Sequence, residues 1–381
     1  MKQKFCVKKI EGEYSENKML LENKDDIKRR PRVLWFMQYA PHYRENLLRA
    51  LGEHCDLTVS ATPCSDHMLI EPADRRGYRY YEGRGLTFFR KVGFWWLPWE
   101  YDLIRKNQWD VIFCVEDMHY PLRYLMYLRW LFSRGCRPKW VWWGHFAGRR
   151  DWLVLKLIRR FLINSSDGAL TYTEEARRML MDFGCKSEKV VSSNNSDVYA
   201  REICLLPVPL IDAQLNVLFV GRYLEEKRVE RLIDLADRLP FIYVRLIGPG
   251  MAVLRRGLER RKLNNRVEVL GPKTSGDLKA DFEWCHILAN PGSLGLQVIL
   301  AAKHGRCIVV DIGSRHGPEV AIAREAGQPF INWGNDSDVD SFFKKAYMGY
   351  VPLKDLGLTL AEYVRTNYTI EQSVQKFTSF F

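Results

Sequence analysis

Residues 217–227 read Val-Leu-Phe-Val-Gly-Arg-Tyr-Leu-Glu-Glu-Lys, and they show the pattern on which the second half of the chain is built. The apolar run at 217–220 predicts a buried strand, and the residues at 228–238 predict a helix. Gly221 permits a tight turn between the two. Arg222 and Lys227 are five residues apart, so both can reach an anion held at the start of the helix. The alternative is a solvated turn with two ordinary surface cations.

The same alternation of strands and helices extends in both directions from this stretch. Further strands are expected at 33–37, 56–60, 111–115, 140–143, 168–172, 242–247, 267–270, 286–289 and 307–310. Helices are expected at 44–53, 122–132, 152–162, 173–184 and 251–262. Strands separated by helices favour parallel sheets, so we predict an α/β protein.

Two Rossmann-like domains facing one another are expected, because the alternation stops in a proline-containing segment and then restarts. We expect a polar tail at 1–30, a first domain at 31–200, a linker at 201–214 and a second domain at 215–355. Residues 356–381 are expected to be helical and to pack back on the first domain. Ligands of such sheets bind beyond the carboxyl ends of the strands, so functional residues are expected in the loops that follow strands.

The chain has 381 residues and an uneven positive charge. Lys and Arg outnumber Asp and Glu by 58 to 46, and residues 121–160 alone carry a net charge of +9. Ten of the twelve tryptophans precede residue 200. A hydrophobic content of 47% excludes a disordered chain, and the basic, aromatic first half favours a polyanionic partner, either a membrane surface or nucleic acid.

Several classes of protein are not expected from this sequence. No apolar stretch approaches the roughly 18 residues of a membrane-spanning helix. The first 30 residues are polar and of mixed charge, so no secretory signal is expected. The nine cysteines include no Cys-x-x-Cys pair, which argues against a zinc site and a disulfide framework and favours a reducing cytoplasm.

Small residues directly follow several of the predicted strands in the second domain. Gly248 and Gly271 each come after a strand. Residues 290–296, Asn-Pro-Gly-Ser-Leu-Gly-Leu, lead into an apolar helix and offer backbone N–H groups suited to a diphosphate. Residues 313–319 read Gly-Ser-Arg-His-Gly-Pro-Glu. Each turn alone is a weak signal, because glycine turns are common in α/β proteins.

In this order, the segments between 215 and 325 resemble the nucleotide-sugar half of glycosyltransferase family 4, which has the two-domain GT-B fold with a central cleft. The resemblance implies a UDP- or GDP-sugar donor and no metal cofactor. It implies that Arg222 and Lys227 are catalytic and clamp the donor diphosphate. The other donor-binding positions that it implies are Gly221, Gly248, Gly271, Ser293, Leu294, Gly295, Leu296 and Glu319.

The chain departs from this family at two positions. The family pattern has a Glu, seven intervening residues and a second Glu, which fall here on Gly292 and Leu300. The second Glu of the family holds ribose hydroxyls, so this chain must use other groups for the nucleotide or has lost the site. Glu319 and Gln297 are the possible substitutes. An active enzyme is preferred because Arg222 and Lys227 are both present.

In the first domain, Trp142-Trp143-Gly144-His145 ends a predicted strand. The family carries a catalytic His aimed at the donor sugar here, which implies that role for His145; the alternative is a His packed beside Trp143. The loop at 39–44 resembles a form found in bacterial surface-polysaccharide transferases. His42 or Arg44 is therefore a candidate for contact with the acceptor or a phosphate, and capping of the helix is the alternative.

The family resemblance implies sugar transfer with retention of anomeric configuration. In this scheme the leaving diphosphate helps to deprotonate the acceptor, while Arg222 and Lys227 stabilise the charge that grows on it. The expected function is synthesis of bacterial lipopolysaccharide, capsule or exopolysaccharide on a lipid-linked saccharide acceptor. The two rivals are a non-catalytic nucleotide- or glycan-binding relative and an epimerase of similar shape.

Aromatic and basic residues alternate at 88–99 and 123–160, as they do on peripheral membrane surfaces. We expect these segments to dock the protein on the inner face of the cytoplasmic membrane; the alternative is that the tryptophans belong to the core. Nucleic acid is not expected as a partner, because no recognised nucleic-acid-binding motif is present.

Overall fold

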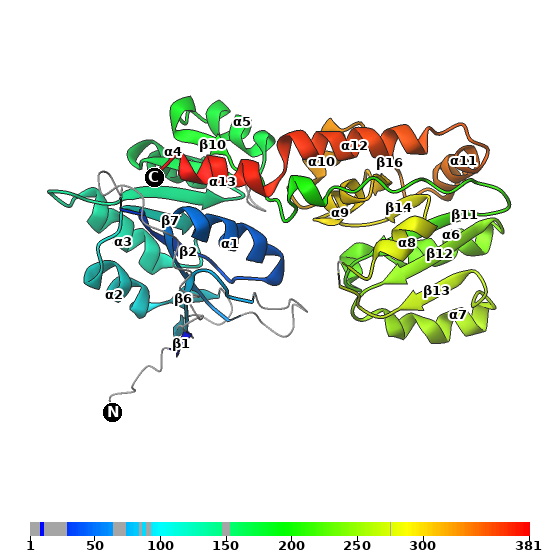
Figure 1. Cartoon of the computed structure of the whole chain (residues 1–381), viewed down its shortest axis with the longest axis horizontal. Helices are drawn as coiled ribbons and strands as arrows, with labels where there is room; N and C mark the ends of the chain where they lie inside the picture. Colours follow the sequence, from blue (N-terminus) through cyan, green and yellow to red (C-terminus); the bar gives the residue numbers. More distant parts are fainter. Residues whose placement is uncertain are drawn as a thin grey trace, which may run out of the picture. The chain divides into compact units, whose positions relative to one another are not determined.

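The computed structural model describes residues 8–10, 29–63, 74–83, 86–88, 93–146, 153–274 and 276–381. The chain forms two compact units (Figure 1). Unit 1 comprises Met1–Asp197 together with Ile370–Phe381, and unit 2 comprises Val198–Thr369. Both units are α/β, as the sequence predicted, and each is described by itself.

Unit 1 is built on an eight-stranded sheet in the order β1-β4-β3-β2-β7-β8-β9-β10. All neighbouring strands are parallel except β1, which is antiparallel to β4. The strands are β1 (Lys8–Ile10), β2 (Arg32–Phe36), β3 (Asp56–Ala61), β4 (Arg79–Glu82), β7 (Val111–Val115), β8 (Lys139–Gly144), β9 (Gly168–Thr171) and β10 (Val190–Ser192). Strands β5 (Leu86–Phe88) and β6 (Phe94–Trp96) form a separate antiparallel pair.

The helices of unit 1 follow the strands, as the alternating pattern predicted. They are α1 (Glu45–His54), α2 (Pro98–Lys106), α3 (Pro121–Leu131), α4 (Leu153–Ser165), α5 (Glu174–Asp182) and α13 (Ile370–Thr378). A 3₁₀ turn, His42–Arg44, precedes α1. Two elements differ from expectation: β1 lies within the segment read as a polar tail, and α2 begins at Pro98, because proline fits the first turn of a helix.

Unit 2 is a doubly wound sheet in the order β13-β12-β11-β14-β15-β16, with all strands parallel. The strands are β11 (Leu215–Val220), β12 (Ile242–Ile247), β13 (Val267–Leu270), β14 (Ile287–Asn290), β15 (Cys307–Asp311) and β16 (Phe330–Ile331). The helices are α6 (Glu230–Arg238), α7 (Arg255–Arg261), α8 (Lys279–Trp284), α9 (Gln297–Lys303), α10 (Val320–Glu325), α11 (Asp336–Tyr347) and α12 (Leu353–Asn367).

The strand order of each sheet reverses at one point, and that point locates the candidate site. In unit 2 the chain winds outward from β11 in one direction and then restarts at β14 on the other side. In unit 1 the same reversal lies between β2 and β7. Ligands of doubly wound sheets bind beyond the carboxyl ends of the strands at such a reversal.

Central strand β11 shows why the apolar run at 217–220 forms this fold. Val217 and Phe219 pack into the core on one face of the sheet, and Leu218 packs into the core on the other. A strand that is buried on both faces is apolar at every position, which is the pattern that predicted it.

The C-terminal segment is divided between the two units. Helix α13 packs against α1 in unit 1, and Figure 1 shows the two helices side by side. The ring of Phe377 lies 4.8 Å from that of Trp35 and 5.0 Å from that of Phe113. The sequence predicted that all of 356–381 packs on the first domain. In the structure only α13 belongs to unit 1, whereas α12 belongs to unit 2.

Residues 201–214, which the sequence pattern suggested as linker, also belong to unit 2. Arg306 is fully buried and donates through Nη1 to the Leu206 carbonyl and through Nη2 to the Pro207 carbonyl, both at 2.7 Å. Its Nε donates to the carbonyls of Phe282 and Cys285. The guanidinium therefore fastens this segment to the core.

We expect Arg306→Met to lower the free energy of unfolding by about 3 kcal/mol or more, because several buried carbonyls lose their donors together. Urea unfolding followed by circular dichroism measures the change. Arg256→Met is the matched control, since Arg256 is exposed and its replacement is expected to cost less than about 0.5 kcal/mol. Equal stabilities of the two variants would contradict the role given to Arg306.

No helix among the described residues is long and apolar enough to cross a membrane.

Candidate active site

The loops that follow β11 and β12 meet at the reversal point of unit 2. The backbone N–H of Gly221 donates to the Ile247 carbonyl at 2.9 Å. Gly248 has a φ of +142°, and a Cβ at this position would lie 1.9 Å from the Gly221 carbonyl oxygen. Only glycine fits such an approach, so both predicted glycines bring two loops together at one edge of the sheet.

The loop after β14 rests on the turn that carries Lys227. The backbone N–H of Ser293 donates to the Glu226 carbonyl at 2.7 Å, and Lys227 Nζ donates to the Ser293 carbonyl at 2.5 Å. A Cβ on Gly292 would lie 2.2 Å from the Glu226 carbonyl oxygen. The two loops are thus in direct backbone contact, which places Lys227 beside residues 293–296.

Lys227 is a buried cation whose ammonium group can donate more hydrogen bonds than the described residues accept. It is 9% exposed, and among the described residues the Ser293 carbonyl takes one of its three N–H bonds. Burial lowers the pKa of Lys227 to about 8; the nearby charges of Glu226 and Glu319 oppose this shift, and Arg222 adds to it. Arg222 and Glu319 therefore lie close enough to Lys227 to interact with it electrostatically.

Gln297 holds the loop after β14 in place. Its Oε1 accepts from Asn290 Nδ2 at 3.0 Å and from the backbone N–H of Gly295 at 3.2 Å. The amide thereby ties the end of β14 to the turn before α9. Gln297, one of the two possible substitutes for a missing carboxylate in the sequence, orders this loop through these two hydrogen bonds.

The segment 313–319 packs against the loop that follows β14. His316 Nδ1 accepts from the Leu294 N–H at 3.1 Å, and its Nε2 donates to the Asp311 carbonyl at 2.7 Å. This pair of contacts requires the neutral ring, and burial lowers the pKa of His316 accordingly. Glu319 is buried directly before α10.

Gly271 and Leu296, two of the predicted donor-binding positions, make no contact with Lys227 that the structure records. Gly271 follows β13, which β12 separates from β11, and a Cβ on it would meet nothing within 4 Å among the described residues. Leu296 directly precedes α9 and packs against the hydrophobic core. Ser293, Arg222 and Glu319 lie close to Lys227, and Gly221 lies against Gly248.

The structure gives physical reasons for the departures from the family pattern. At Gly292, any side chain would collide with the backbone of Glu226 and Lys227, so a Glu has no room. Leu300 lies on α9 and packs against the core of unit 2. The local backbone packing therefore differs from one built around a pair of carboxylates.

In unit 1, the predicted residues His145 and Arg44 come together beyond the ends of the strands. His145 directly follows β8, and its ring lies 4.1 Å from that of Tyr172. Surrounding protein atoms displace part of the water around the His145 ring, and this desolvation, together with repulsion from Arg44, lowers the pKa of His145 to about 4. His145 is therefore neutral at pH 7. The residue still has an exposed surface. His42 is exposed and stacks edge-on with Tyr43.

Sequence reasoning missed a polar pair in the loop after β7. His119 Nδ1 lies 2.6 Å from Asp117 Oδ1, and the backbone N–H of His119 also donates to this carboxylate. The i, i+2 spacing of Asp and His directly after a strand is the signal that marks the pair. It lies at the strand reversal of unit 1.

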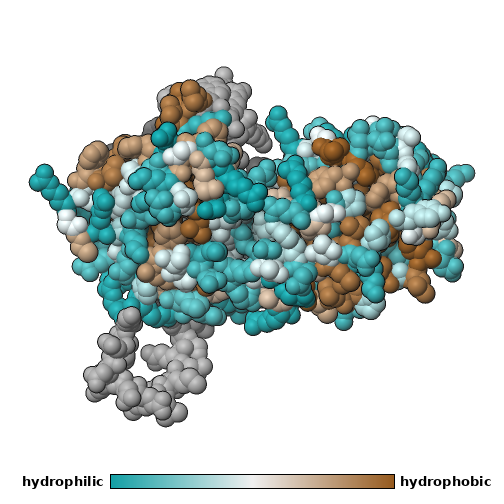
Figure 2. Space-filling model, turned by 90° about the horizontal axis from the view of Figure 1, so that it is seen from above, coloured by the Kyte–Doolittle hydropathy of each residue, from teal (hydrophilic) through white to brown (hydrophobic). Residues whose placement is uncertain are grey.

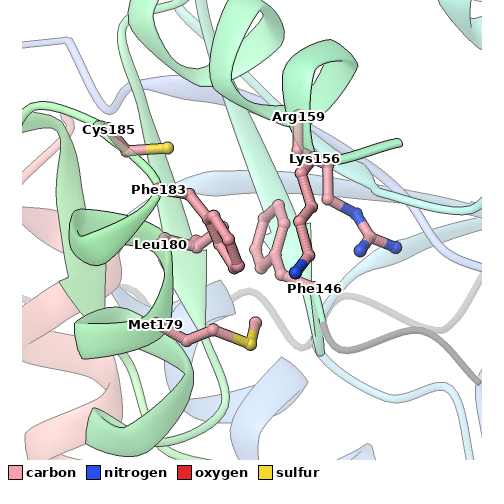
Figure 3. A pocket seen from close by; sticks show the side chains of 7 residues that line it. All are labelled: Phe146, Lys156, Arg159, Met179, Leu180, Phe183 and Cys185. Carbon is pink, nitrogen blue, oxygen red and sulfur yellow. The ribbon is translucent and has the colours of Figure 1, made fainter. Parts of the chain in front are cut away.

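Two hollows in the described part of the chain are lined by other residues. One, of about 10 Å³, lies between α4 and α5 and is shown in Figure 3, where Lys156 and Phe183 approach one another. That volume is at the lower limit for a single water. The other, of about 160 Å³, lies between α6 and the start of α11. The predicted site residues lie instead in the loops at the strand ends.

No protein-family model and no curated protein matches the sequence. Solved structures do match in fold. HepE from Anabaena, in complex with UDP, has a TM-score of 0.66 and 11% identity over 91% of this chain and 98% of that chain.

A glycosyltransferase from Rickettsia africae has a TM-score of 0.66 and 13% identity over 92% of this chain and 97% of its own. The lipopolysaccharide outer core galactosyltransferase WaaB has a TM-score of 0.60 and 12% identity over 92% and 98%. At these identities the likeness defines the fold alone. The chain has the GT-B fold of these glycosyltransferases, as its sequence predicted.

Proposed function

We propose that this chain transfers a sugar from a UDP- or GDP-sugar to a glycan acceptor. The observation that carries the proposal is the buried Lys227 ammonium, which has Arg222 nearby and lies at the strand reversal of unit 2. Two cations beside a loop of backbone N–H groups suit a diphosphate. The UDP-bound state of HepE, which shares the fold, supports a nucleotide donor.

The proposed chemistry retains the anomeric configuration. The acceptor oxygen forms a bond to the anomeric carbon on the side from which the diphosphate leaves, and the diphosphate takes the acceptor proton and the electron pair of the broken C–O bond. Lys227 and Arg222 stabilise the charge on the leaving group, so the proposal includes no metal ion.

A panel of nucleotide sugars, assayed for release of the nucleoside diphosphate with and without a membrane lipid extract, tests the proposal. Acceptor-dependent release from one donor is expected. The rival of a non-catalytic relative, which Gly292 and Leu300 favour, predicts no release from any donor. An epimerase of similar shape predicts free sugar without any acceptor.

The pH dependence of donor binding follows from the position of Lys227. Because its pKa is about 8, the charged form that attracts a diphosphate is present below pH 8 and is lost above it. We expect the Kd for UDP, measured by calorimetry, to rise up to tenfold between pH 8 and pH 9. Lys227→Arg is the control, since a guanidinium does not titrate in this range. The same rise in the control would assign the effect to another group.

We further propose that the acceptor is lipid-linked, in lipopolysaccharide, capsule or exopolysaccharide synthesis, and that the protein works on the inner face of the cytoplasmic membrane. Four large apolar residues on α4 are exposed by more than half: Leu153, Val154, Leu157 and Phe161. They share one face of the helix with the exposed Arg160. Figure 2 shows hydrophobic residues at the surface among hydrophilic ones.

Exposed cations lie near these apolar residues in the sequence. Helix α3 and the segment after it expose Arg129, Arg134, Arg137 and Lys139. An apolar helix face accompanied by cations suits an anionic lipid surface. The expectation for 88–99 is corrected in part, since Leu97 and Trp99 are buried in the core; residues 89–92 lie outside the described residues.

We expect the double variant Leu157→Glu/Phe161→Glu to lose most of its binding to vesicles that contain anionic lipid, measured by co-sedimentation at low salt. Each substitution removes buried apolar area in the lipid and adds repulsion. Leu358→Glu, on α12 in unit 2, is the control at a comparable exposed leucine. Unchanged sedimentation of the double variant would rule out α4 as the docking element.

A further inference from the structure

Arg44 is a buried cation without a carboxylate partner. It lies in the turn between β2 and α1 and is 6% exposed. Among the described residues no Asp or Glu forms an ion pair with it. The buried Arg123 of the same unit differs, because Glu100 pairs with it through two hydrogen bonds. A buried charge is costly unless a counter-charge completes it.

Aromatic rings hold the Arg44 guanidinium in one orientation. Its Cζ lies 4.6 Å from the ring centre of Trp143 and 5.1 Å from that of Tyr172. Its Nη2 donates to the Tyr172 hydroxyl at 3.0 Å. These contacts compensate part of the charge and fix the plane of the group, as cation–π contacts do.

The other guanidinium nitrogens remain open to a ligand. Tyr172 is the one hydrogen-bond partner that the described residues provide for Arg44. Nη1 of Arg123 and Nη1 of Arg231 are buried from water without a hydrogen-bond partner, whereas no nitrogen of Arg44 is both buried from water and without a hydrogen bond. Its Nε and Nη1 therefore still reach solvent. A guanidinium that offers N–H groups side by side matches the oxygens of a phosphate or a carboxylate.

The place of Arg44 in the fold is that of a ligand-binding residue. It follows β2 at the strand reversal of unit 1, where doubly wound sheets bind ligands. The exposed ring of His145 lies against the ring of Tyr172, the same side chain that accepts a hydrogen bond from Arg44. Arg44 and His145 thus contact the same aromatic side chain at one edge of the sheet.

We propose that Arg44 and His145 bind an oxyanion, a phosphate or a carboxylate, that the glycan acceptor carries. The inference rests on the proposed transferase function, in which Arg222 and Lys227 of unit 2 hold the donor diphosphate. The acceptor class is therefore an anionic saccharide, and Arg44 selects it by charge and by the geometry of its N–H groups.

The test uses the full chain and the ring signal of His145. Protein labelled at histidine Cε1 is titrated with inorganic phosphate, and separately with acetate, in the presence of saturating UDP; the His145 signal is assigned from the variant His145→Gln. A saturable shift of the His145 signal by one or both anions is expected. Arg44→Met is expected to raise the apparent Kd at least tenfold, whereas Arg49→Met, on the exposed side of α1, is not.

Three results would overturn the proposal. The first is a His145 signal that neither anion moves, and the second is an equal response in Arg44→Met. The third is a response that appears only without UDP, which would show that the anion occupies the place of the donor diphosphate. Where Arg44→Met fails to fold, Arg44→Lys replaces it, and a three- to tenfold weaker affinity is expected because the planar group is lost. Failure of UDP and GDP to bind would count against the proposed function, not against this anion site.

Discussion

Lys227→Met is expected to lower kcat/KM for the donor about 100- to 1000-fold while the fold remains intact. The ammonium is the buried cation among the loops at the strand reversal, and loss of one preorganised donor to a leaving group costs this much in comparable sites. Methionine keeps the length and the apolar stem of the side chain, so the substitution removes mainly the charge and its hydrogen bonds. Release of the nucleoside diphosphate measures the loss.

The control for this prediction is Lys344→Met. Lys344 is an exposed lysine on α11 of the same unit, outside the loops that form the candidate site. We expect its replacement to leave kcat/KM within twofold of the native value. Near-native turnover in Lys227→Met would remove Lys227 from the chemistry, and equal losses in both variants would point to a general loss of charge.

Gly292→Ala is expected to abolish measurable donor binding, and Gly292→Glu is expected to do the same. The glutamate variant restores the residue of the family pattern, so the prediction runs against the resemblance. A Cβ at 292 would lie 2.2 Å from the Glu226 carbonyl oxygen and 2.6 Å from the Lys227 carbonyl carbon. The loop must move away from Lys227, which breaks the contacts of Ser293 with both Glu226 and Lys227.

Calorimetry with UDP and GDP, together with thermal unfolding, measures this second effect. Overpacking of this kind costs about 1–3 kcal/mol in stability. Gly257→Ala, on α7 outside the candidate site, is the control that is expected to leave donor binding unchanged, because a Cβ at 257 meets nothing within 4 Å among the described residues. Stronger nucleotide binding in Gly292→Glu would show that the family's carboxylate fits after all.

Much of the fold could be predicted from the sequence because its central strands are buried on both faces. Leu218 packs on one side of β11 while Val217 and Phe219 pack on the other, so the apolar run alone marked the strand. Short edge strands lack such a signal. β1 lies in a polar segment and pairs through its backbone with β4, which side-chain patterns do not reveal.

The candidate site could be predicted in part. Gly221 directly follows β11 and Lys227 lies in the same connection to the next helix, so both could be selected as candidates from local order alone. The reason for Gly292 is not local, because the carbonyl that excludes a side chain belongs to Glu226, which is distant in sequence. The environment of Arg44 likewise depends on Trp143, which lies in β8, and on Tyr172, which directly follows β9. Such contacts are set by tertiary packing.

The central claim is that the loops around Lys227 bind a nucleotide diphosphate for sugar transfer. Calorimetric titration of the native protein and of Lys227→Met with UDP and GDP at pH 7 tests it most directly. The account predicts saturable binding of one of the two nucleotides to the native protein and a loss of at least tenfold in affinity in the variant. Absence of binding of both nucleotides to the native protein would contradict it.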